Sequence, residues 1–192
     1  MRVFDKSNIP KPVMQVDLPT NFSNLDIEIG CGVGFHPIDY AKNNPERLLV
    51  AIEKTSEKFA KFLGRLEKHP QIKNVVPVHT NAIWWVAHYV KPQSVDRYFI
   101  LYPNPYPKDP QKRFFEMPFM TYLVETLKPG GIITLATNEK YYFDESLENA
   151  QKIFGLKVIE NRIVEKSEKP RTHFEKKYLE RGETCYNLVL KK

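Results

Sequence analysis

A glycine-rich loop that follows an acidic residue is the first feature of this chain with chemical potential. The segment Glu28-Ile-Gly30-Cys-Gly32-Val-Gly34 spaces its glycines two residues apart, and glycine lets a backbone turn tightly and approach a bound group closely. A dinucleotide fingerprint requires its third glycine at position 35, where this chain has Phe, so NAD and FAD are disfavoured. A Walker loop is also absent, because no Gly-Lys-Ser/Thr follows.

A second acidic residue, Glu53, lies 19 residues beyond Gly34, at the end of the apolar segment 48–52. A carboxylate at the end of a second strand can accept hydrogen bonds from both hydroxyls of a ribose. The pattern therefore favours an adenosine-containing ligand without a pyrophosphate, S-adenosylmethionine, with Glu28 facing its cationic aminoacyl end. The structural alternative is a plain tight turn and an acid that stabilises a helix N-terminus through the dipole.

Four prolines among nine residues mark 102–110 as a stiff loop, because proline fixes φ and removes a backbone donor. Within it, Asn104 offers one carbonyl acceptor and no charge. Tyr102 and Tyr106 could stack on a nucleobase, although Tyr102 could equally pack beneath the loop. The loop is therefore a candidate site for a base.

These candidate residues need a scaffold that brings them together, and the hydrophobic pattern predicts one. Expected strands are 25–29, 48–52, 75–79, 95–101, 132–136, 156–164 and 184–190, and expected helices are 35–43, 55–68, 82–89, 117–127 and 139–153. The alternation predicts an α/β fold: a Rossmann-like, mostly parallel sheet with helices on both faces and a C-terminal antiparallel hairpin. Since carboxyl ends of parallel strands share one edge, 30–35, Glu53 and 102–110 should meet there.

The composition is that of a folded protein with a basic excess. The 192 residues carry 29 Lys+Arg and 23 Asp+Glu, a formal net charge of +6. Residues 91–113 contribute +3 and residues 157–192 contribute +4, so these segments would suit phosphate groups if they met in space. The phosphate candidates are Lys108, Lys112, Arg113 and Arg171.

We expect an N-terminal arm, 1–24, and a single domain, 25–192. Two cysteines, and histidines without metal spacing, indicate neither a disulfide framework nor a metal site, and no histidine is expected to be catalytic. The chain lacks an apolar signal core and a run of about 18 apolar residues, so we expect no membrane contact and a cytoplasmic location. No obligate protein partner is evident.

Five motifs, in order along about residues 25–190, resemble the bacterial tRNA (guanine-N7)-methyltransferase family. They are Glu28-Ile-Gly-Cys-Gly-Val-Gly34, Ala51-Ile-Glu53, Tyr102-Pro-Asn-Pro-Tyr-Pro-Lys108, Leu135-Ala-Thr-Asn138 and Arg171-Thr-His-Phe-Glu175. The first motif is shared by many methyltransferases, whereas the proline loop and the Thr-x-Phe-Glu segment are more specific together.

The resemblance implies a class I methyltransferase fold, with S-adenosylmethionine as methyl donor and N7 of a guanine in the tRNA variable loop as acceptor. By motif, the cofactor-binding residues would be Glu28, Gly30, Gly32, Gly34, Glu53, Asn81 and Ala82. The catalytic residues would be Asn104 and Glu175. The substrate-binding residues would be Tyr106, Lys108, Asn138, Thr172, Phe174 and Glu175.

The chain departs from the family pattern at several of these positions. The family typically has Asp at 81, 104 and 138, where this chain has Asn, and Trp at 106, where it has Tyr. The basic run after the loop is also thinned. Two alternatives therefore stay open: a divergent paralogue that methylates another base or a small molecule, and an RNA-binding relative with weakened catalysis. The Asn-Pro-aromatic order also resembles the loop of amino-methyltransferases acting on adenine or cytosine, an interpretation that leaves 172–175 unexplained.

Overall fold

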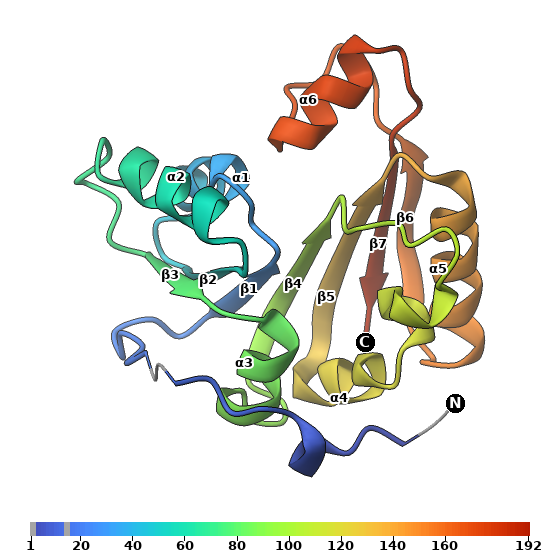
Figure 1. Cartoon of the computed structure of the whole chain (residues 1–192), viewed down its shortest axis with the longest axis horizontal. Coiled ribbons are helices and arrows are strands. Elements are labelled where there is room, and N and C mark those ends of the chain that lie inside the picture. The colour runs from blue at the N-terminus through green and yellow to red at the C-terminus, as the bar shows by residue number, and fades with distance from the viewer. Residues whose placement is uncertain (1–2, 14–15) are drawn as a thin grey trace.

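Seven strands form one mixed sheet in the computed structural model, which describes residues 3–13 and 16–192 (Figure 1). The strands are β1 (Leu25–Ile29), β2 (Leu48–Glu53), β3 (Val75–His79), β4 (Val95–Leu101), β5 (Leu127–Thr137), β6 (Lys157–Ile163) and β7 (Tyr186–Lys191). Their order is β3-β2-β1-β4-β5-β7-β6. Strands β1 to β5 pair in parallel, whereas β7 pairs antiparallel with both β5 and β6.

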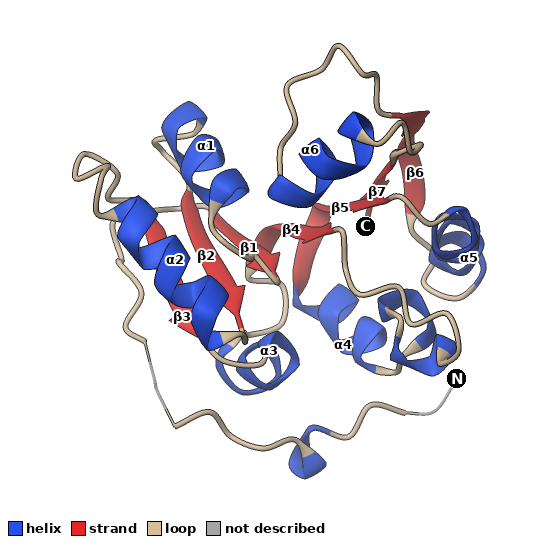
Figure 2. Cartoon of the chain, turned by 45° about the horizontal axis from the view of Figure 1, so that its top comes forward, coloured by secondary structure: helices blue, strands red, loops and turns tan. Residues whose placement is uncertain are grey.

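Helices cover both faces of this sheet (Figure 2). One face carries α1 (Phe35–Asn43), α2 (Ser56–Leu66) and α6 (His173–Glu180), and the other carries α3 (Ala82–Tyr89), α4 (Phe119–Thr126) and α5 (Lys140–Lys152). The predicted α/β architecture, mostly parallel with antiparallel strands at the C-terminal side, is confirmed. Within the described ranges, no helix is both long and apolar enough to cross a membrane.

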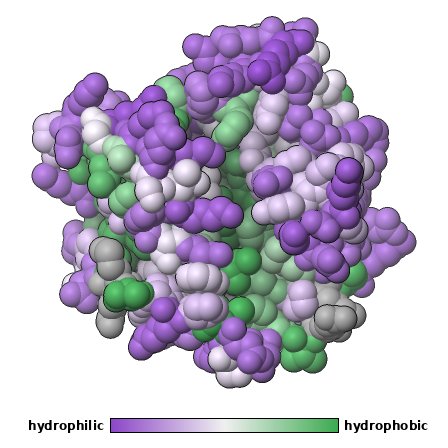
Figure 3. All heavy atoms as spheres, viewed as in Figure 1, coloured by the Kyte–Doolittle hydropathy of each residue, from purple (hydrophilic) through white to green (hydrophobic). Residues whose placement is uncertain are grey.

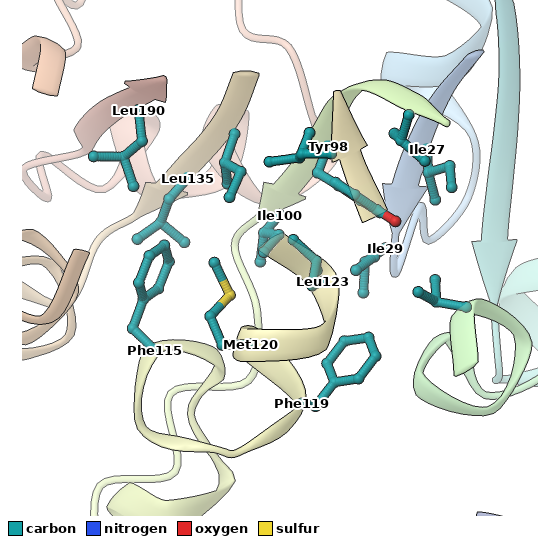
Figure 4. Packing of buried hydrophobic residues seen from close by; sticks show 14 of the residues in the cluster. Ile27, Ile29, Tyr98, Ile100, Phe115, Phe119, Met120, Leu123, Leu135 and Leu190 are labelled. Carbon is teal, nitrogen blue, oxygen red and sulfur yellow. The ribbon is translucent and has the colours of Figure 1, made fainter. Parts of the chain in front are cut away.

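The main core lies between the sheet and helices α3, α4 and α5. Alternate strand residues such as Ile27, Tyr98 and Ile100 belong to the same buried cluster as Leu123 of α4 (Figure 4). The residues between them, such as Phe99, belong to a second cluster on the α1 and α6 face. Every residue of β2 is buried, as its continuous apolar sequence predicts for a parallel strand covered on both faces.

Two elements differ from the expectation. Strands β6 and β7 are not joined by a short turn, because α6 lies in the connection between them. The sequence did not predict α6, since its eight residues are mostly polar and include the fully buried Glu175. Strand β5 begins at Leu127 rather than at Ile132, because a register shift against β4 accommodates the intervening Pro-Gly-Gly segment.

The N-terminal arm packs beside α3 and α4. The ring of Phe4 makes an edge contact with Phe119, with centroids 5.5 Å apart. A ring nitrogen of His88 lies 2.8 Å from a backbone oxygen of the arm, and the Tyr89 hydroxyl donates to another at 3.0 Å. Side chains of α3 therefore fix the path of the arm. Residues 1–2 and 14–15 of the expected arm lie outside the described residues.

The strand order reverses between β1 and β4, and this reversal positions the candidate residues. From β1 the chain crosses toward β2 through α1, whereas from β4 it crosses in the other direction toward β5. A crevice opens where two such crossovers diverge, at the carboxyl ends of the strands. The glycine loop after β1, the end of β2 and the proline loop after β4 all lie at that edge.

Gly34 offers a test of the packing at this edge. Its φ is +83°, and an added Cβ would lie 2.1 Å from Cδ2 of Phe62 in α2. We expect Gly34→Ala to lower the free energy of unfolding by about 2 kcal/mol or more, because left-handed backbone and overpacking both cost stability. The matched control is Gly64→Ala within α2, where an added Cβ meets nothing within 4 Å.

That control should raise the free energy of unfolding by about 0.5–1 kcal/mol, since alanine is the better helix former. Urea denaturation of the two variants measures the difference. A Gly34→Ala protein as stable as the parent would contradict the close approach of Gly34 to Phe62 of α2.

Candidate active site

One cavity of about 570 Å³ lies at the reversal of the strand order. Its wall includes the glycine loop, the ends of β2 and β4, the start of α3, the proline loop and the start of α6. The predicted site residues on this wall are Glu28, Gly30, Gly32, Glu53, Asn81, Ala82, Asn104, Tyr106, Thr172 and Phe174. The size falls in the range of about 300–1,000 Å³ that is typical of small-molecule sites.

The glycine loop turns tightly against the end of β2. The backbone N–H groups of Gly30 and Cys31 both donate to the carbonyl oxygen of Ile52, at 2.8 and 3.0 Å. Gly30 and Gly32 have φ of +75° and +60°, and a Cβ added to either would meet nothing within 4 Å. These glycines therefore serve the turn and leave open space beside the backbone, which a bound group can approach.

Backbone amides hold the Glu53 carboxylate in place. One oxygen accepts from the N–H of Gly32 at 2.9 Å, and the other accepts from the N–H of Thr55 at 2.7 Å. Each carboxylate oxygen has a further acceptor position, so the group can still receive two hydroxyl donors. A fixed carboxylate at the end of β2 fits a ribose with adjacent hydroxyls.

Glu28 is paired with a histidine, His36. Nδ1 of His36 lies 2.7 Å from Oε2 of Glu28, and both side chains are buried on the cavity wall. The ring of His36 also makes an edge contact with Phe99. No catalytic role was expected for His36, although its position two residues after Gly34 places it beside the glycine loop. The pair keeps the Glu28 carboxylate oriented.

Asn81 is the N-cap of α3. Its Oδ1 accepts from the backbone N–H of Ile83 at 2.9 Å. Asp and Asn are equally good N-caps, so the Asn at this position preserves the local structure. The amide nitrogen of Asn81 adds donors that a carboxylate lacks, and it lies beside Ala82 on the cavity wall.

The proline loop holds two tyrosines in a left-handed backbone conformation. Tyr102 has φ of +53° and Tyr106 has φ of +42°, a conformation that costs roughly 1–2 kcal/mol for a residue other than glycine. Between them, Oδ1 of the exposed Asn104 accepts from the backbone N–H of Tyr106 at 3.3 Å. Such strain persists only where surrounding contacts impose it, and it is commonest at functional sites.

Glu175 fixes the start of this loop through a hydrogen bond from Tyr102. Its carboxylate, which is fully buried, accepts from the Tyr102 hydroxyl at 2.6 Å and from the Arg171 guanidinium at 2.6 Å. Burial alone would raise the pKa of Glu175, but the hydrogen bonds and charge of Arg171 outweigh burial and hold that pKa below its usual value. Burial beside Glu175 raises the pKa of Tyr102, so the hydroxyl keeps its proton.

Several expected site residues do not reach the cavity wall. Gly34 packs against Phe62, and Glu175 faces inward toward Arg171 and Tyr102. Asn138 donates to Glu183 at 2.9 Å. Lys108 is exposed on the proline loop outside the cavity lining.

Three of the four side chains expected to contact phosphates form salt bridges with carboxylates of the protein. Arg113 is buried and pairs with Glu145, and Arg171 pairs with Glu175. Lys112 pairs with Asp109 at 2.8 Å on the surface, and its ammonium also lies near the ring of Tyr106. The two guanidinium groups therefore compensate internal carboxylates. In the described part of the chain, no cluster of three His, Cys, Asp or Glu side chains could hold a metal ion.

Known proteins with similar sequences cover most of the chain. A family model described as "Putative methyltransferase" matches residues 23–188. A tRNA (guanine-N(7)-)-methyltransferase of Aquifex aeolicus is 30% identical over 93% of this chain and 60% of its own length. A tRNA (guanine-N(7)-)-methyltransferase of Ruegeria sp. is 31% identical over 92% of this chain and 71% of its own length. This chain therefore spans somewhat less than two thirds of the Aquifex relative.

The fold has close matches among solved structures. A 16S rRNA methyltransferase superposes with a TM-score of 0.67 at 16% identity, covering 90% of this chain and 89% of that protein. At this identity the likeness shows the fold alone. It confirms the expected class I methyltransferase architecture.

The hydrogen bonds that Glu175 accepts from Tyr102 and Arg171, here called the Glu175 network, predict how the stability of the fold depends on pH. The ordinary pKa of Glu is about 4.3, and the pKa of Glu175 in the folded protein is lower. Ionised Glu175 therefore stabilises the fold above about pH 4.3, and this stabilisation is lost as pH falls through the folded pKa. We expect Glu175→Gln to lower the free energy of unfolding at pH 7 by about 3 kcal/mol, because it leaves the Arg171 charge uncompensated.

The control is Tyr102→Phe, which removes one hydrogen bond and should cost about 1 kcal/mol. Urea titrations between pH 3 and pH 7 measure both effects. The Glu175→Gln protein should lose less stability on acidification than the parent. If the Glu175→Gln protein and the parent lost equal stability on acidification, a stabilising role of ionised Glu175 would be contradicted.

Proposed function

The chain belongs to the methyltransferase family whose model spans it, and we propose that it transfers a methyl group from S-adenosylmethionine to N7 of a guanine in the variable loop of tRNA. One observation carries the proposal: a single cavity joins a fixed carboxylate of ribose-binding type, Glu53, to the proline loop with Asn104 and Tyr106. The relatives with this activity in their names support the choice of substrate. The proposed compartment is the cytoplasm.

Residues of the glycine loop and of β2 fit the methyl donor. Glu53 would accept the ribose hydroxyls, and the open backbone at Gly30 and Gly32 would lie along the donor. Glu28, oriented by His36, would face the cationic aminoacyl group. Asn81 would contact the adenine through its side-chain amide. When bound, S-adenosylmethionine supplies an electrophilic methyl group on a sulfonium centre.

The chemistry at guanine N7 requires no general base. N7 carries a free lone pair, so the protein must align the two reactants and exclude water. As the new N–C bond forms, the S–C bond breaks, and the positive charge passes from sulfur to the guanine ring. No proton moves in this step.

The proline loop would hold the guanine. The carbonyl oxygen of Asn104 can accept a hydrogen bond from the Watson–Crick edge of the base, and Tyr106 would offer a ring for stacking. Thr172 would complete the pocket from the start of α6, and Phe174 would contact the RNA at the rim of the cavity. In this proposal Glu175 acts as a positioning residue, because it holds Tyr102 and the start of α6 and does not line the cavity.

The direct test is incubation of the protein with radiolabelled S-adenosylmethionine and tRNA that lacks 7-methylguanine. We expect label in 7-methylguanine after digestion to nucleosides, and none with the Glu53→Gln variant, which should bind the donor poorly. Binding of the donor without transfer to any RNA would contradict the proposal. Label in an adenine or cytosine derivative would instead support the amino-methyltransferase interpretation.

Substitutions at position 104 test the acceptor side. An aspartate there can accept from N1–H and N2–H₂ of guanine with a charged group, and charge-assisted hydrogen bonds are roughly twice as strong as neutral ones. We therefore expect Asn104→Asp to raise kcat/KM for tRNA about fivefold to tenfold, and Asn104→Ala to lower it. Initial rates at subsaturating tRNA measure both. Equal rates in all three proteins would exclude contact between position 104 and the base.

A further inference from the structure

Exposed aromatic rings on the rim of the cavity are each accompanied by a cation from α2. Phe35 is 45% exposed, and the guanidinium carbon of Arg65 lies 4.1 Å from its ring centroid. Phe174 is 38% exposed, and Nζ of Lys58 lies 5.3 Å from its centroid. The ring of His173 stacks on Phe35, with 6.0 Å between centroids and 6° between planes. We call these five residues the rim cluster.

The rim cluster joins three helices at the edge of the proposed substrate cavity. Phe35 begins α1, Lys58 and Arg65 belong to α2, and the other two residues begin α6. Four of the five, all but Arg65, line the cavity itself. A molecule that fills the cavity and extends past its mouth on this side would therefore contact the rim cluster.

The charge around the rim cluster is basic. Residues 54–68 carry five basic and two acidic side chains. Lys61 is salt-bridged to Glu57 at 2.6 Å, whereas Lys58 and Arg65 form no salt bridge with any described residue. Hydrophilic side chains gather over α6 and over the region of α1 and α2 (Figure 3). This combination of charge and exposed rings suits a polyanion that also carries flat groups.

The cations and the rings can exchange partners when such a polyanion binds. An exposed cation–π contact is weaker than the stacking of a nucleobase on an aromatic ring. A base can therefore replace Lys58 over Phe174, or Arg65 over Phe35. The displaced cation, on a long flexible stem, can then pair with the adjoining phosphate.

We propose that the rim cluster holds an unpaired RNA segment on the α2 side of the cavity, with bases on Phe35 and Phe174 and phosphates on Lys58 and Arg65. Only unpaired nucleotides expose their base faces to a ring, and a base drawn into a cavity is flanked by nucleotides pulled from their stack. This inference rests on the proposed function. An acidic protein segment, which has no flat bases to stack, is the rival occupant.

The test measures binding of a fluorescein-labelled oligouridylate by anisotropy over a range of salt concentrations. We expect the double variant Lys58→Ala/Arg65→Ala to bind about tenfold more weakly at low salt. The slope of log K against log salt should fall by about 1.4, which is about 0.7 for each of two lost single-strand phosphate contacts. The matched control is Lys61→Ala on the same helix, which should change neither quantity.

An aromatic variant separates stacking from charge. Phe174→Leu keeps an apolar side chain but removes the ring, so binding should weaken about fivefold or more at every salt concentration while the slope stays unchanged. General misfolding would not lower the salt slope in the double variant while leaving it unchanged in Phe174→Leu. Parental affinity and slope in both the double variant and Phe174→Leu would overturn the proposal. Tighter binding of a poly-glutamate of equal charge than of the oligouridylate would also overturn it, in favour of a protein partner.

Methyl transfer to tRNA is measured separately, so that the two proposals fail in different ways. If the parent protein transfers the methyl group but the substitutions leave RNA binding unchanged, only the proposal that the rim cluster binds RNA would be overturned. Oligouridylate binding that depends on the rim cluster, without any transfer to tRNA, would overturn the proposed function. It would still support RNA binding by the rim cluster.

Discussion

The buried carboxylate of Glu175 is the interaction on which the acceptor side of the cavity depends. It receives the hydroxyl of Tyr102 from the proline loop and the guanidinium of Arg171 from the segment before α6. Arg171 in turn donates to Asn187 of β7 at 2.6 Å. Three distant segments thus share one negative charge, and a buried charge that loses its partner is costly. The positions of the loop, of α6 and of β7 are therefore set together.

The donor side of the cavity has a different basis, because backbone groups hold it. The amides of Gly32 and Thr55 fix Glu53, and the carbonyl of Ile52 fixes the glycine turn. Backbone geometry follows from the sheet and tolerates many side chains. A nucleoside-binding half built on the sheet can therefore stay constant while the half built from side-chain contacts between loops changes its acceptor.

The same division decides what the sequence could predict. A continuous apolar run predicts β2, and the glycine spacing predicts the turn beside Glu53, because both patterns are local. The role of Glu175 is not local, since its partner Tyr102 lies 73 residues away, and a carboxylate within a motif resembles a substrate ligand until its partners are known. The basic residues of α2 do not stand out as a net charge in the sequence, because acidic residues of the neighbouring segments nearly balance them in number.

The left-handed tyrosines of the proline loop have a consequence for the speed of substrate capture. Ordering a loop around a ligand costs conformational entropy, of the order of 1–2 kcal/mol per residue fixed. Here four prolines restrict the unfolded loop, and the bond from Tyr102 to Glu175 fixes its start when the protein folds. The acceptor half is thus preorganised, and binding need not wait for the loop to find its shape.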